Sequence, residues 1–161
     1  MKLVPDYERP TMSQKAGADL ALLLLRLPIG VTFLLAGLGK VTGGVANFVN
    51  DSAKAIPAFL PESLGRASLW CVPWAELTVG VCLILGLLTR VFGLIATLML
   101  ISFIIAATGV WAYKPGGPLN FNVMYASLTL ALALLGPGRI SLDTLLFRGG
   151  GSHASRGGGE K

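Results

Sequence analysis

Three long stretches of the sequence carry almost no charge. Residues 20–38 and residues 69–89 contain one charged side chain each, and residues 91–113 contain none. About 20 residues of helix cross a hydrocarbon core about 30 Å thick, so each stretch is long enough to span a bilayer. Only 13% of the 161 residues are charged and 53% are apolar, whereas an average soluble domain has about 25% charged residues. This pattern excludes an ordinary water-soluble domain and predicts an integral membrane protein.

Glycine and proline clusters separate the apolar stretches. Gly43 and Gly44 follow the first stretch, Lys-Pro-Gly-Gly-Pro at residues 114–118 follows the third, and Gly-Pro-Gly at residues 136–138 ends a shorter fourth. Such clusters break helices and mark turns. We therefore expect an all-α protein, an integral membrane four-helix bundle within residues 19–147. Its spans are expected at residues 19–40, 69–88, 91–113 and 121–135.

The two ends of the chain differ from the bundle. We expect the polar residues 1–18 to form a cytoplasmic N-terminal segment and the Gly-rich residues 149–161 to form a disordered tail. Four spans place both termini on one side, and eight lysine and arginine residues fall on that side against four on the other. The positive-inside rule then predicts cytoplasmic termini, and we expect the protein in a bacterial cytoplasmic membrane. The net charge of +5 is thereby attributed to topology, and no nucleic-acid partner is expected.

Residues 45–66, between the first and second spans, have a different pattern. Apolar residues recur every three or four positions from Val45 to Ile56, and polar residues such as Asn47 and Asp51 occupy the other side. This spacing predicts a short amphipathic helix in the membrane interface, broken by the prolines that follow Ile56. An ordered loop folded over the mouth of the bundle is the alternative that the pattern leaves open.

Apart from Asp19 and Lys40 at the two ends of the first span, the predicted spans contain two charged residues, Arg26 in the first and Glu76 in the second. A charge in a span costs at least about 2.5–3.5 kcal/mol on insertion scales, so it usually faces the bundle interior and has a partner. At 1.5 Å per residue, Arg26 lies about 9 Å from the cytoplasmic edge and Glu76 about 10 Å from the outer edge. Lys40, at the outer end of the first span, is about as far from Glu76 as Arg26 is. The sequence leaves open which of the two cations pairs with Glu76.

Glycines accompany these charges along one face of each helix. The stripe on the first span has spacings of three and four residues and consists of Arg26, Gly30, Phe33, Gly37 and Lys40. A similar stripe on the second span consists of Glu76, Gly80, Leu83, Leu87 and Arg90. Because glycines permit close backbone approach, we expect the first two spans to meet along these stripes. The polar centre of Arg26, Glu76 and Lys40 is then either a structural ion pair that fixes helix register or a proton, ion or quinone site.

Other polar residues are secondary candidates. Asn120 and Asn122 open the fourth span, where one of them is expected to cap the helix. Cys71 falls at the outer edge of the second span, where a buried free thiol is favoured over a bond to a partner chain. Cys82 is about 16 Å further along the same helix, too far for a disulfide with Cys71. The single histidine, His153, leaves too few ligands for haem or zinc, so no metal site is expected.

Several segments together resemble DoxX-type membrane proteins. The first span carries LRLPIG at residues 25–30, FLLAG at residues 33–37 and Gly39-Lys40. The second carries ELTVG at residues 76–80 and LGLLTR at residues 85–90, and the bundle ends with GPGR and then SLD at residues 136–143. The resemblance covers about residues 20–147 and implies a four-helix membrane bundle. It also implies that Arg26, Lys40, Glu76, Arg90 and Asp143 occupy the family's characteristic polar positions.

The resemblance also implies a redox role. Related DoxD-type proteins are described as a subunit of thiosulfate:quinone oxidoreductase, and some DoxX proteins are linked to membrane oxidoreductase assemblies that handle thiol and oxidative stress. We therefore expect a small membrane subunit of a redox or quinone-linked assembly, in which a quinone is bound without covalent attachment. A protein partner would carry the redox cofactor, and a homo-oligomer is the alternative association. A non-catalytic scaffold or assembly factor and a small transporter of a weak acid or sulfur species are the alternative functions.

Overall fold

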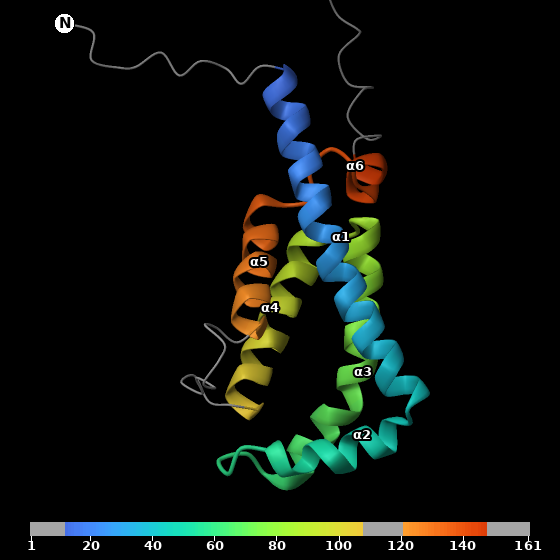
Figure 1. The fold of residues 1–161 in the computed structure, drawn as a ribbon, viewed down its shortest axis with the longest axis vertical. Coiled ribbons are helices and arrows are strands. Elements are labelled where there is room, and N and C mark those ends of the chain that lie inside the picture. The colour runs from blue at the N-terminus through green and yellow to red at the C-terminus, as the bar shows by residue number, and fades with distance from the viewer. Residues whose placement is uncertain (1–11, 108–120, 148–161) are drawn as a thin grey trace, which may run out of the picture.

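The computed structural model describes residues 12–107 and 121–147 (Figure 1). Four parts of the sequence prediction lie outside these described residues. They are the start of the N-terminal segment, the end of the third span beyond residue 107, Asn120, and the expected tail at residues 149–161. Within them the chain is helical and contains no strand. The elements are α1 (Met12–Thr42), α2 (Val45–Ser52), the 3₁₀ helix η1 (Ala53–Ala55), α3 (Glu62–Leu85), α4 (Thr89–Ala107), α5 (Phe121–Leu135) and α6 (Leu142–Phe147).

The helices α1, α3, α4 and α5 run along the long axis of the molecule, with α2 across one end and α6 at the other (Figure 1). We call these the α2 end and the α6 end. Among the described residues, three stretches are long and apolar enough to cross a membrane: Gln14–Thr42, Glu62–Leu85 and Thr89–Ala106. The described part of α5 is apolar and has 15 residues, about 22 Å at 1.5 Å per residue. The expected all-α membrane bundle is confirmed.

The second long helix begins and ends earlier than the sequence predicted. α3 begins at Glu62, directly after Pro61, rather than at residue 69, so Pro73 lies inside the helix rather than near its start. It ends at Leu85 because Gly86 adopts a left-handed conformation with φ 68°. The N–H groups of Gly86 and Leu87 donate to the carbonyls of Leu83 and Cys82, the bonding pattern of a Schellman cap. The turn before α4 is therefore built on Gly86.

The predicted interfacial segment contains both a helix and a loop. The amphipathic helix α2 is present but ends at Ser52, and its one buried residue is Val49. After η1 the chain becomes extended at Ile56, whose side chain packs against Gly65 of α3. A Cβ at Gly65 would lie 2.6 Å from Ile56 Cγ2, so the absence of a side chain there allows the loop to fold onto α3.

The helices associate in two pairs, α1 with α3 and α4 with α5. In the first pair the glycine stripes meet as predicted: a Cβ on Gly80 would lie 2.5 Å from the backbone nitrogen of Leu34 and 2.8 Å from the carbonyl oxygen of Gly30. In the second pair, Thr97 and Thr129 share a buried hydrogen bond of 2.8 Å. The core between the pairs consists of Ile29, Phe33, Val79, Leu83, Ala96, Leu100 and Leu132.

Candidate functional site

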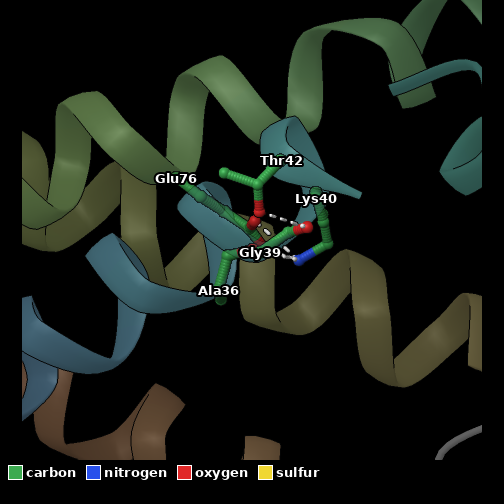
Figure 2. A network of polar contacts seen from close by, with 5 residues as sticks. All are labelled: Ala36, Gly39, Lys40, Thr42 and Glu76. Atoms are coloured by element: carbon green, nitrogen blue, oxygen red, sulfur yellow. Dashed lines mark hydrogen bonds and ion pairs between the residues drawn. The ribbon is translucent and has the colours of Figure 1, made fainter. Parts of the chain in front are cut away.

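A salt bridge joins α1 to α3 near the α2 end. Lys40 Nζ lies 2.6 Å from Glu76 Oε2 and 2.8 Å from Oε1, as Figure 2 shows. The same ammonium group donates to the carbonyl of Ala36 at 3.4 Å and lies 5.3 Å from the centre of the Phe48 ring of α2. Of the two pairings that the sequence left open for Glu76, the structure has the one with Lys40.

Close packing of α1 on α3 sets the register of this salt bridge. A Cβ at Gly37, one turn before Lys40, would lie 2.9 Å from both Pro73 O and Leu77 N. Gly37 thus packs on the segment of α3 that carries Glu76. The side chain of Glu76 is only 3% exposed, while that of Lys40 is 24% exposed. The carboxylate is therefore held inside the bundle, whereas the lysine side chain is partly accessible.

Arg26 does not belong to this polar centre. Its guanidinium donates to the carbonyls of Pro137 and Ile140 at 2.8 and 2.9 Å, in the loop between α5 and α6, and the residue is 2% exposed. Arg26 and Lys40 are separated by about 21 Å along α1 at 1.5 Å per residue. The expected three-residue centre is thus divided, because the arginine side chain reaches the α6 end instead of the membrane centre.

The secondary candidates are also separate from the salt bridge. Asp143 accepts hydrogen bonds from the backbone N–H groups of Leu88 and Thr89 at 2.7 and 3.2 Å, so it caps the start of α4. Arg90 is exposed at the α6 end. Cys71 is exposed on α3, which corrects the expectation of a buried thiol, because its side of α3 is not covered by α1 or α2. Asn122 borders the chamber described next.

A chamber of about 640 Å³ lies between the two helix pairs at the α2 end. The salt bridge forms part of its wall, and most of the remaining wall is apolar, including Ile29, Phe33, Val72 and Leu100. Its other polar lining residues are Thr32, Ser52, Ser68, Ser102, Asn122 and Tyr125. No local pattern in the sequence predicted this chamber, because five helices, from α1 to α5, and the loop before α3 contribute to it. The local sequence feature that relates to the chamber is the presence of small residues at the start of α3, such as Gly65 and Ser68, which leave space beside the helix.

The polar side chains of this wall can take part in hydrogen bonding and proton exchange. In the part of the chain that the structure describes, no group of three His, Cys, Asp or Glu side chains is arranged to hold a metal ion. Lys40 offers hydrogen-bond donors and Glu76 offers acceptors on a surface that is otherwise mainly apolar. Such a site suits an apolar molecule that has one polar, uncharged end, because the net charge of the salt bridge is zero.

Comparison with known proteins gives a consistent family. The DoxX family model matches residues 21–109. The chain is also 28% identical over 131 residues to a Bacillus subtilis (strain 168) protein named "Putative oxidoreductase CatD", covering 81% of this chain and 90% of that protein. No solved structure matches the chain significantly. More than half of the chain is thus matched by one family model, and the protein belongs to the DoxX family.

Proposed function

We propose that this protein is a small membrane subunit of a redox assembly and that its chamber binds a membrane quinone. The chamber with the buried Lys40–Glu76 salt bridge in its wall carries the proposal. The name of the Bacillus relative, which describes an oxidoreductase, supports the redox part. The protein resides in a bacterial cytoplasmic membrane with both termini in the cytoplasm, so the α2 end lies toward the outer surface.

The residues of the chamber fit the two parts of a quinone. The apolar wall accommodates the hydrocarbon part. Lys40 Nζ donates to a ring carbonyl in place of its long hydrogen bond, 3.4 Å, to the carbonyl of Ala36. A bound quinone supplies two-electron, two-proton chemistry. Glu76 is a buried carboxylate beside that donor, so it can hold a proton near the ring oxygen. The electrons come from a cofactor on a protein partner, since proteins leave such chemistry to cofactors.

A chamber-filling variant with a matched control tests the proposal. Ala36 lines the chamber, whereas its neighbour Leu35 is 61% exposed on the outer surface of α1. Ala36→Phe is expected to weaken binding of a short-chain menaquinone or ubiquinone analogue to the purified protein at least about tenfold. Leu35→Phe adds a ring on the same helix and is expected to leave binding unchanged. Equal binding by wild type and Ala36→Phe would rule out the chamber as the quinone site.

The redox part is tested separately in membranes. Membranes with and without this protein are assayed for quinone reduction by thiosulfate or sulfide, and wild-type membranes are expected to reduce quinone faster. Glu76→Gln is expected to lower this rate per amount of protein present in the membrane. The scaffold alternative predicts the reverse, a loss of protein or of assembled partner with an unchanged rate per assembly. Equal rates with and without the protein would overturn the redox role.

A further inference from the structure

A second concavity lies at the α6 end, far from the chamber. It is an open groove of about 550 Å³ between the turn before α4 and the loop that joins α5 to α6. The turn contributes Leu88, Arg90 and Val91, and the loop and α6 contribute Pro137, Arg139, Asp143 and Thr144. Because α4 starts and α5 ends beside it, the groove lies at the level where spanning helices leave the hydrocarbon core. We propose that this groove binds the phosphate group of an anionic phospholipid.

The charge of the groove favours an anion. Its charged lining residues are two arginines and one aspartate. Both oxygens of Asp143 already accept backbone N–H groups of the turn. Neither Arg90 nor Arg139 forms a side-chain hydrogen bond or ion pair with any residue that the structure describes. Two guanidinium groups are thus available, and guanidinium binds phosphate oxygens through paired hydrogen bonds.

The loop that presents Arg139 is fixed in place from α1. The backbone N–H of Arg139 donates to Asp19 Oδ1 at 2.8 Å, and Arg26 donates to the carbonyls of Pro137 and Ile140. The Arg90 side chain packs against Gly136 at the end of the α5 helix: a Cβ added at Gly136 would lie 3.0 Å from Arg90 Nε. The backbone of this loop is therefore held in place, and Arg26, which does not line the chamber, has a role in holding it.

The surroundings of the arginines favour a lipid over free phosphate. Leu88 and Val91 line the groove beside the arginines and are 45% and 51% exposed. Apolar side chains at this level are suited to the first part of an acyl chain, which a free phosphate ion lacks. Basic pockets at the ends of spanning helices on the cytoplasmic side are suited to anionic lipid head groups, and the eight-to-four distribution of basic residues assigns the α6 end to that side.

Native mass spectrometry of the detergent-solubilised protein tests this site. Wild type is expected to retain one phosphatidylglycerol molecule at least about tenfold better than phosphatidylcholine. The variant with both Arg90→Gln and Arg139→Gln is expected to lose this preference. Arg66→Gln is the matched control, because Arg66 lies at the other end of the bundle and bonds to Glu62. Circular dichroism and size-exclusion chromatography check that each variant is folded.

Two results would overturn the proposal. One is equal retention of phosphatidylglycerol by wild type and by the folded double variant. The other is displacement of the lipid by inorganic phosphate at equal concentration, which would assign the arginines to the free ion. If the double variant fails to fold, Arg139→Gln alone is used, because the Arg139 side chain is exposed in the loop. The chamber variants keep their lipid preference, so this test is independent of quinone binding.

Discussion

Replacing Lys40 with methionine leaves the Glu76 carboxylate buried without the ammonium group that neutralises it. The carboxylate side chain is 3% exposed, and both of its oxygens lie within 2.8 Å of Lys40 Nζ. Removing one partner of a buried ion pair costs about 3–5 kcal/mol, because the remaining charge is left unpaired in an apolar environment. We expect Lys40→Met to lower the free energy of unfolding by this amount.

The reverse replacement is expected to cost less. Glu76→Gln retains an amide oxygen that accepts from Lys40, and the Lys40 side chain, 24% exposed, can move its charge toward water. The expected cost is about 1–3 kcal/mol, the value of a hydrogen bond to a charged group. The double variant with Lys40→Met and Glu76→Gln has no buried charge at this point, so it is expected to be more stable than Lys40→Met alone. The coupling energy should therefore be larger than the cost of Glu76→Gln alone, about 3 kcal/mol.

Unfolding of the four proteins in mixed micelles by increasing SDS, followed by circular dichroism, measures these free energies. The order of stability should be wild type, Glu76→Gln, the double variant, and Lys40→Met last. If Lys40→Met lowers the free energy of unfolding by less than about 1 kcal/mol, the reasoning is refuted, because an exposed salt bridge contributes about that much. A double variant as unstable as the sum of the single ones would also refute it, because additive effects mean that the two side chains do not interact.

Two further predictions use the same unfolding assay. Gly80→Ala would place a Cβ against the backbone of Leu34 and Gly30, at 2.5 and 2.8 Å, and we expect it to lower the free energy of unfolding by about 1–3 kcal/mol. The control Gly39→Ala has nothing within 4 Å of the added Cβ and should be neutral or stabilising. Equal effects of the two substitutions would argue against the close α1–α3 contact. Asp143→Ala removes the acceptor for two N–H groups at the start of α4 and is expected to lower the free energy of unfolding by about 0.5–2 kcal/mol. Asp51→Ala is the control, because Asp51 is exposed. A neutral result for Asp143→Ala would show that the cap does not stabilise the bundle.

The membrane-spanning character of the chain and much of its helical layout could be predicted from the sequence. Apolar length and Gly-Pro breaks are local properties, and the bilayer thickness converts them directly into spans. The meeting of the first two helices was also predictable, because Gly30, Gly37 and Gly80 lie on single faces at helical spacing. The start of α3 at Glu62 was not, because the turns before residue 69 are too polar to be recognised as part of a span.

Only the tertiary structure decided how the charges are used. Depth estimates left Arg26 and Lys40 equally near Glu76, and a long side chain can reach toward either end of a helix. The choice depends on the register of α1 against α3 and on the loop after α5, which offers its carbonyls to Arg26 from 111 and 114 residues away in the chain. The chamber likewise exists only where two helix pairs stand apart. Such non-local contacts leave no periodic pattern in the sequence, whereas the helices that form them do.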